Sequence, residues 1–321
     1  MGTVFYPAYN DGAPDKDTER LLARLSKTPG TPFSQMTVKD VRDTFFDKEW
    51  LAKPDEGIKI NNVFIPAMSG SIRLRVYTPA GEGLFPILLF FHGGGFVVGR
   101  VEEFDSFCAS IAAGANCLVV SADYRLAPEN KFPAQIEDLE TVLKWLPVNA
   151  KSIGGDRNRI AVAGDSAGGN LAALASIIDR DKGYAGIVHQ VLICPWLDIS
   201  LTERESYKFF GDGIWLSKST MVWFRDHYIN TNEDAKSYPA SPIFLENFSG
   251  LPPALIIAAE LDVLADEGKL FRDKLVSSGV PVQYSLYKGT LHDFITLPLL
   301  FSRANDAIEE VCNSLIKHFT L

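Results

Sequence analysis

A serine lies among small residues in the segment Gly164-Asp165-Ser166-Ala167-Gly168-Gly169, between an apolar run at 160–163 and a helical pattern at 170–178. Small residues on both sides of a serine allow the chain to turn sharply from a strand into a helix. The serine then stands at the helix N-terminus, where the helix dipole and free amides favour developing negative charge. We predict Ser166 as a nucleophile; an ordinary serine in a glycine-rich turn is the alternative, which the strand-to-helix context disfavours.

A serine hydroxyl is a weak nucleophile at neutral pH, so it needs a base and an orienting acid. In serine hydrolases with this kind of turn, the groups follow along the chain as serine, acid and histidine. Three of the four histidines after Ser166 lie beside a predicted strand or in predicted helices: His189, His227 and His318. His292 lies instead in a loop after the last strand pattern, at the carboxyl edge where the sites of open α/β sheets form. We therefore predict His292 as the base.

The acid should follow the apolar run at 254–259, where four carboxylates compete: Glu260, Asp262, Asp266 and Glu267. Asp262 comes shortly after the strand end, from where it can reach the imidazole N–H that faces away from the serine. Asp266 and Glu267 fit the first turn of the next helix, and Glu260 fits the strand. We predict that Asp262 fixes the tautomer of the base and stabilises the imidazolium without taking a proton.

Three successive glycines follow another apolar run, in His92-Gly93-Gly94-Gly95-Phe96. Glycines let backbone amides converge on one point, and with the N–H of Ala167 they would form an oxyanion hole. One such donor can lower the barrier by ~3 kcal/mol. A flexible loop is the alternative, which the serine turn makes less attractive. We predict that His92 shapes this loop, and we predict no metal and no cofactor, because neither ligand spacing nor a nucleotide-binding pattern is present.

The elements that must position these groups follow from the hydrophobic pattern. Alternation at 58–63 and 72–76 predicts an antiparallel strand pair. Fully apolar runs follow, separated by helical patterns such as 136–146 and 308–319; these runs lie at 87–91, 117–120, 160–163, 191–194, 254–259 and 282–286. Strands covered by helices on both faces have this appearance. The predicted fold class is α/β, with a mostly parallel central sheet flanked by helices.

Two segments interrupt this alternation. Residues 1–50 carry two short amphipathic helical patterns. Residues 200–245 are longer than an ordinary connection and are rich in aromatic side chains, which predicts a helical insertion. Trp215 and Trp223 of this insertion are candidate substrate contacts, with core packing as the alternative.

Composition limits the partners. The 321 residues carry 31 basic and 40 acidic side chains, a net charge of −9, and 46% are hydrophobic. This composition is typical of globular proteins. The acidic balance argues against nucleic acid or a membrane surface as the main partner. Four scattered cysteines form no CxxC pair, and we find neither a signal peptide nor a long apolar run. We expect a cytoplasmic protein. The one protein partner that we consider is a second copy of this chain, in a homodimer.

Over about residues 55–320 the sequence resembles the hormone-sensitive lipase family of α/β hydrolases, the bacterial family IV esterases, in the branch with a GDSAG serine motif. The segments that carry the resemblance are 92–95, 123–129, 164–169, 262–267 and 292–294. The resemblance implies an α/β-hydrolase fold with a helical cap. The cap would comprise residues 1–50 and 200–245, and the core residues 51–199 and 246–321.

The resemblance also implies roles for single residues: Ser166 as nucleophile, Asp262 as acid, His292 as base, and the amides of Gly93, Gly94 and Ala167 as the oxyanion hole. Which two of the glycines 93–95 donate stays open, and segment 123–129 is implied as a structural brace. Val263 stands where the family commonly has Pro, and Asp293 where Gly is common. We expect the Asp293 carboxylate to raise the proton affinity of the base and to shift the acidic limb of activity.

These residues predict a serine carboxylesterase, a carboxylic ester hydrolase that acts through an acyl-enzyme. The resemblance implies short- to medium-chain acyl esters as its substrates. The substrate would be a small ester molecule. Two alternatives remain: an amide, formamide or N-acyl hydrolase that uses the same triad, and a non-catalytic receptor for a small ligand on the same fold.

Overall fold

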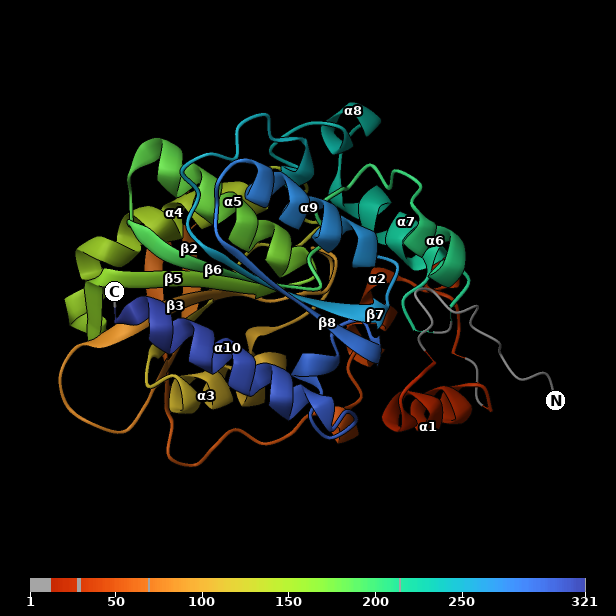
Figure 1. Cartoon of the computed structure of the whole chain (residues 1–321), viewed down its shortest axis with the longest axis horizontal. Coiled ribbons are helices and arrows are strands. Elements are labelled where there is room, and N and C mark those ends of the chain that lie inside the picture. Colours follow the sequence, from red (N-terminus) through yellow and green to blue (C-terminus); the bar gives the residue numbers. More distant parts are fainter. Residues whose placement is uncertain (1–12, 28–29, 69, 214, 321) are drawn as a thin grey trace.

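A sheet of eight strands forms the centre of the protein (Figure 1). The structure is a computed structural model that describes residues 13–27, 30–68, 70–213 and 215–320. The strand order across the sheet is β1-β2-β4-β3-β5-β6-β7-β8. The strands span Lys59–Ala67 (β1), Gly70–Thr78 (β2), Phe85–Phe91 (β3), Leu118–Asp123 (β4), Gly155–Asp165 (β5), Ile187–Ile193 (β6), Ala254–Leu261 (β7) and Val282–Leu291 (β8).

The strand directions follow from the burial pattern. β1 and β2 form the predicted antiparallel pair, and β2 also runs antiparallel to β4. All other neighbouring strands are parallel. The central strands bury both faces, and every side chain of β7 is buried, as expected for a parallel sheet between two helical layers. Each of the six apolar runs identified in the sequence lies largely within one of these strands.

Helices cover both faces of the sheet (Figure 1). One face carries α3 (Asp105–Gly114) and α10 (Arg303–Phe319), and the other carries α4 (Ala134–Asn149), α5 (Ala167–Lys182) and α9 (Ala265–Ser277). This is the predicted α/β architecture. Within the described residues, no helix is both long and apolar enough to cross a membrane.

Both interrupting segments are helical, as the sequence predicted. The N-terminal segment holds α1 (Lys16–Leu25) and α2 (Val38–Thr44), and the later segment holds α6 (Glu205–Phe210), α7 (Lys218–Tyr228) and α8 (Asn232–Ala235). Residues 1–12 and 28–29 of the N-terminal segment lie outside the described residues. Helices α1, α2, α6 and α7 gather at the end of the molecule toward which β7 and β8 point (Figure 1).

Aromatic side chains join the two helical segments. The ring of Phe33 lies 5.5 Å from that of Trp223 and 5.9 Å from that of Phe224, measured between centroids. The Phe45 ring lies 6.3 Å from the Phe224 ring. Edge-to-face pairs of this kind stabilise packing beyond the burial of their area. The two segments, far apart in the sequence, therefore form one layer.

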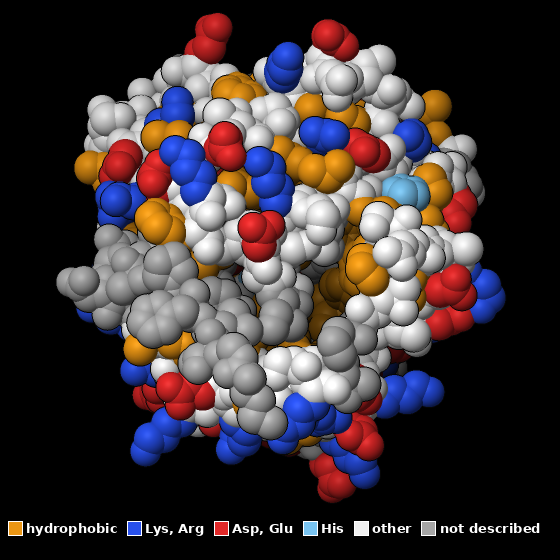
Figure 2. Space-filling model, turned by 90° about the vertical axis from the view of Figure 1, so that its right-hand side faces the viewer, with side chains coloured by type: hydrophobic (Ala, Val, Ile, Leu, Met, Phe, Trp, Pro, Cys, Tyr) orange, Lys and Arg blue, Asp and Glu red, His pale blue; other side chains and the backbone are white. Residues whose placement is uncertain are grey.

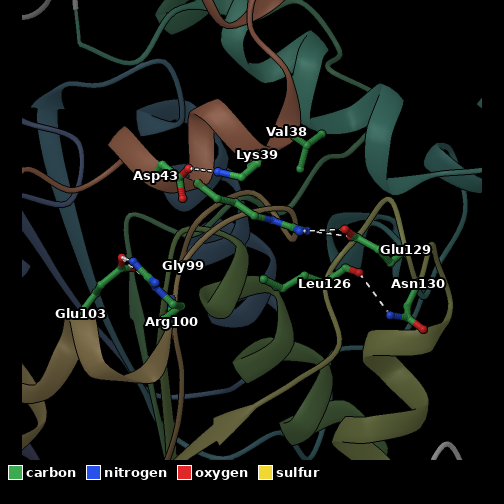
Figure 3. A pocket seen from close by; sticks show the side chains of 10 residues that line it. Val38, Lys39, Asp43, Gly99, Arg100, Glu103, Leu126, Glu129 and Asn130 are labelled. Atoms are coloured by element: carbon green, nitrogen blue, oxygen red, sulfur yellow. Dashed lines mark hydrogen bonds and ion pairs between the residues drawn. The ribbon is translucent and has the colours of Figure 1, made fainter.

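Arg42 ties this layer to the core. Its Nε donates to the carbonyl of Val97 at 2.9 Å, and its Nη2 donates to the carbonyl of Ala127 at 2.8 Å. Both terminal nitrogens also contact the Glu129 carboxylate at 2.8 Å. A cavity of about 640 Å³ lies beside this contact, and Lys39, Asp43 and Arg100 are among the residues that line it (Figure 3).

Candidate active site

The turn that carries Ser166 has room only for glycine two residues before and two residues after the serine. Ser166 sits between β5 and α5 with φ 53° and ψ −117°, a strained conformation for a residue with a side chain. A Cβ on Gly164 would lie 2.1 Å from the carbonyl oxygen of Gly168, and a Cβ on Gly168 would lie 1.9 Å from that of Phe91. The sharp strand-to-helix turn thus depends on these glycines, and it holds Ser166 at the N-terminus of α5.

The structure brings the three predicted triad residues together. The Ser166 Oγ lies 3.0 Å from the Nε2 of His292, and the His292 Nδ1 lies 2.7 Å from the Oδ2 of Asp262. Asp262 follows β7 and His292 follows β8, so neighbouring strand ends supply both groups. The other oxygen of Asp262 accepts the N–H of Leu264 at 2.9 Å, which holds the carboxylate in place. All three side chains are buried.

The competing carboxylates are engaged elsewhere. Glu260 is a buried residue of β7, and its Oε2 accepts the N–H of Gly289 at 2.7 Å. Glu267 lies in the first turn of α9, as predicted, but its side chain does not reach solvent there. One of its oxygens accepts the N–H groups of Leu197 and Asp198, at 2.7 and 2.8 Å. Burial raises the pKa of Glu267 well above its usual range. Glu267 therefore braces the chain after β6.

The other histidines after Ser166 have structural contacts. His189 is buried between the carbonyl of Pro253, 2.7 Å from Nδ1, and the hydroxyl of Ser314, 2.9 Å from Nε2. Burial, aided by the charge of the His318 ring stacked beside it, lowers the pKa of His189 to about 3. His227 of α7 bonds through its Nδ1 to the carbonyl of Trp223 at 2.8 Å. Each of these rings is held away from Ser166.

The glycine loop after β3 offers three backbone amides, and one of them already has an acceptor. The N–H of Gly93 donates to the Oδ1 of Asp165 at 2.9 Å, which argues against the predicted oxyanion role of Gly93 because that donor is already used. Among the described residues, the N–H groups of Gly94 and Gly95 have no hydrogen-bond acceptor. Ala167 is the first residue of α5, so its N–H has no acceptor within the helix.

The His92 side chain and the segment 123–129 contact the backbone of this loop. The Nδ1–H of His92 donates to the carbonyl of Gly93 at 2.7 Å, and the carbonyl of His92 accepts the Tyr124 hydroxyl at 2.7 Å. The two rings stack with their centroids 4.5 Å apart. Further along, the N–H of Ala127 donates to the carbonyl of Phe96 at 2.9 Å. These contacts agree with the loop-shaping role predicted for His92 and the brace implied for the segment.

Trp215 reaches the base from the 200–245 segment, a contact that the sequence analysis missed. Its indole Nε1–H donates to the backbone carbonyl of His292 at 2.9 Å. The Trp50 ring of the N-terminal segment lies 5.7 Å from the Trp215 ring. Trp223 is buried against Phe33 and its neighbours instead. Substrate contact by Trp215 or Trp223 stays a prediction.

Negative charge dominates the surroundings of His292. The Oδ2 of Asp293 lies 3.1 Å from its Nε2, the nitrogen that also meets Ser166. Burial disfavours the charged imidazole, but the carboxylates of Asp262 and Asp293 outweigh it and raise the pKa of His292 well above its usual range. Burial raises the pKa of Asp165 well above its usual range, and the charge of Asp293 adds to this effect.

The Cys194 thiol completes this environment. One side-chain atom each of Cys194, Asp262 and His292 lie within 4.8 Å of one another. Burial raises the pKa of Cys194 to about 11, although a hydrogen bond with His292 opposes the rise. Cys194 is therefore a neutral thiol at neutral pH, and the carboxylates are the charged partners of the base.

A serine held by a histidine and a carboxylate beside free backbone amides is the arrangement of a serine hydrolase. A family model described as the alpha/beta hydrolase fold matches residues 88–296. The chain belongs to the α/β-hydrolase family. Within this family it belongs with the hormone-sensitive-lipase-like family IV esterases, as its motifs indicated.

The names of proteins similar to this chain agree with its place among the α/β hydrolases. Ethyl acetate hydrolase of Pseudomonas putida is 32% identical, over 95% of this chain and 98% of its own length. The carboxylic ester hydrolase LipN of Mycobacterium tuberculosis is 35% identical, over 85% of this chain and 74% of its own. Among solved structures, a hyperthermophilic esterase from the archaeon Pyrobaculum calidifontis has a TM-score of 0.90 and 36% identity, covering 95% of this chain and 98% of that one.

Proposed function

We propose that the protein is a serine carboxylesterase that hydrolyses short- to medium-chain acyl esters. The observation that carries the proposal is the connected set Asp262–His292–Ser166, at 2.7 and 3.0 Å, beside amides that have no acceptor. Names of its relatives, including an ethyl acetate hydrolase and several esterases, support ester cleavage.

The geometry suggests how each group would act. The Ser166 Oγ attacks the ester carbonyl carbon while the His292 Nε2 takes the hydroxyl proton. The developing oxyanion accepts N–H groups from Gly94, Gly95 and Ala167, the donors without another partner. The imidazolium then gives its proton to the leaving alcohol, and water cleaves the acyl-enzyme by the same route. Asp262 holds the ring in the required tautomer throughout.

We further propose that residues 1–50 and 200–245 form a cap that limits substrate size, over a core of residues 51–199 and 246–321. The aromatic contacts of Phe33 and Phe45 with α7 support a joint layer. Figure 2 shows the end of the molecule at which α1, α2, α6 and α7 gather. The surface there has a hollow, and hydrophobic side chains are exposed in its wall. An apolar hollow of this kind suits small acyl groups.

The proposal is tested by the Ser166→Ala variant with a short-chain aryl ester as substrate. The variant should lose at least about a thousandfold in kcat, because triad knock-outs remove the acyl-enzyme route. Ser176→Ala is the matched control. Within the described part of the chain, the hydroxyl of this buried serine of the same helix bonds only the carbonyl of Ala172, and its loss should leave turnover unchanged.

A fluorophosphonate probe separates the enzyme from a receptor on the same fold. The wild-type protein should be labelled once, at Ser166, and the Ser166→Ala variant should not be labelled. Wild-type protein that binds small esters without turnover and without labelling would refute the esterase and favour the receptor. A chain-length series of acyl esters then tests the size limit, since preference for long chains would contradict it.

A further inference from the structure

Asp293 contacts the nitrogen at which the chemistry takes place. Two side-chain oxygens lie near the His292 Nε2: the Ser166 Oγ at 3.0 Å and the Asp293 Oδ2 at 3.1 Å. The second oxygen of Asp293, Oδ1, is buried and has no hydrogen-bond partner among the described residues. The Asp262 carboxylate occupies the opposite nitrogen, Nδ1. The imidazole is thus held between two carboxylates, one on each nitrogen.

The backbone fixes the direction of the Asp293 side chain. Asp293 has φ 55°, in the left-handed region that few residues with a side chain adopt. Its carbonyl accepts both the N–H and the hydroxyl of Thr296, at 3.1 and 2.9 Å. The next residues, Phe294 and Ile295, are fully buried. These anchors fix the backbone at Asp293 and with it the direction of the Cα–Cβ bond.

The groups around the imidazole are acids and neutral donors. Asp262 faces it from the end of β7, Asp165 acts on it from the end of β5, and the neutral Cys194 thiol lies after β6. Among the described residues, no lysine or arginine forms an ion pair with Asp165, Asp262 or Asp293. The imidazolium is therefore the cation that the carboxylates of Asp262 and Asp293 contact, and Asp293 is the acid at its reacting nitrogen.

We propose that Asp293 is a catalytic residue of the esterase reaction: a second anionic partner of the imidazolium, placed at the nitrogen that exchanges protons with Ser166. This inference rests on the proposed function. As Ser166 attacks, its O–H bond breaks and an N–H bond forms at Nε2. The Asp293 Oδ2 accepts a charge-assisted hydrogen bond from this N–H. The proton then passes from Nε2 to the leaving alcohol, and Asp293 itself takes none.

The same contact has a cost at low pH. A carboxylate beside Nε2 also stabilises the imidazolium of the resting enzyme, in which the base already carries a proton and cannot accept one from Ser166. Removing the charge should therefore have two opposite effects. Below the wild-type acidic limb the variant should be faster, because more of its His292 is neutral. On the alkaline plateau it should be slower, because the imidazolium of the transition state has lost a partner.

The test compares the pH profiles of kcat/KM for the wild type and Asp293→Asn on a short-chain aryl ester. A neighbouring opposite charge shifts a pKa by about 1 to 3 units, so the acidic limb should move down by about that amount. One pKa unit is a tenfold change in the ratio of charged to neutral imidazole, so the plateau should fall by at most about tenfold for each unit by which the limb moves. The two profiles should cross.

Two further variants make the result interpretable. Asp293→Gly also removes the carboxylate, and glycine adopts φ 55° without strain, so it tests the charge even if the Asn variant fails to fold. Asp306→Asn is the control, because it makes the same charge change at an exposed position in the first turn of α10. The Gly variant should show the same crossing, and the control profile should overlay that of the wild type.

Folded Asn and Gly variants that keep the wild-type limb would overturn the inference, as would profiles lowered in parallel at every pH. An NMR titration of the His292 ring gives a readout independent of turnover. If the protein cleaves esters but His292 titrates at the same pH with and without Asp293, this inference fails while the proposed function stands. A wild type without turnover or Ser166 labelling would instead refute the proposed function.

Discussion

Replacing Trp215 by phenylalanine tests whether the 200–245 segment helps to hold the catalytic base. The substitution keeps an aromatic ring beside Trp50 but removes the indole N–H that donates to the His292 carbonyl at 2.9 Å. We expect kcat to fall and KM to change little, because the lost bond acts on the position of the base and not on the substrate.

The size of the effect follows from the strength of one hydrogen bond. Such a bond contributes about 1 kcal/mol net, and a half-buried carbonyl left without a donor loses about 1 to 3 kcal/mol. Only the part of this free energy that is lost in the transition state, through a less firmly held His292 ring, lowers kcat. A loss of about 1 kcal/mol there corresponds to about a fivefold decrease in kcat. We expect a decrease of about three- to tenfold.

Trp50→Phe is the matched control for this measurement. It removes an indole N–H from the adjoining ring, but that N–H is buried without a hydrogen-bond partner among the described residues. Steady-state kinetics on a short-chain aryl ester should separate the two variants, with Trp50→Phe near the wild type. Equal values for both would refute the role of the hydrogen bond. A rise in KM at constant kcat for Trp215→Phe would instead indicate direct substrate contact.

Two substitutions probe the other contacts of the same layer. Gly95→Ala should lower kcat/KM by more than about tenfold, because its Cβ would lie 2.2 Å from the Phe224 ring. The double variant with Phe224→Ala should recover part of this loss in the same kinetic assay. No recovery would contradict a clash with Phe224 as the cause. Arg42→Gln should lower the melting temperature by about 2 to 4 °C, since its two lost bonds to backbone carbonyls are together worth about 2 kcal/mol. Arg100→Gln, whose exposed pair with Glu103 contributes little, is the control in the thermal melt.

The strands were predictable because burial on both faces leaves a direct mark on the sequence. Runs such as 254–259 contain apolar side chains in succession, which a strand between two helical layers requires. The order of the strands was not predictable in this way. That β4 lies between β2 and β3 depends on how the connecting helices pack, and no single segment of the sequence carries that information.

The triad was predictable because chemistry and chain order restrict the choices strongly. Ser166 needs its glycines, and among the later histidines only His292 follows the last strand in a loop. The amide donors were harder, since successive glycines look alike in sequence. The commitment of Gly93 to Asp165 depends on the direction of one side chain in three dimensions. The Trp215 contact was missed for the same reason, because a loop aromatic has no periodicity that reveals what it touches.

The layer formed by the two helical segments contacts the groups to which we assign the chemistry. Arg42 bonds to the carbonyl of Val97, just beyond the glycine loop, Phe224 lies against Gly95, and Trp215 bonds to His292. The loop with the proposed amide donors and the proposed base are therefore both contacted by side chains from these segments. Changes made there to alter substrate size should consequently alter kcat as well as KM, whereas changes confined to the outer helix faces should alter neither.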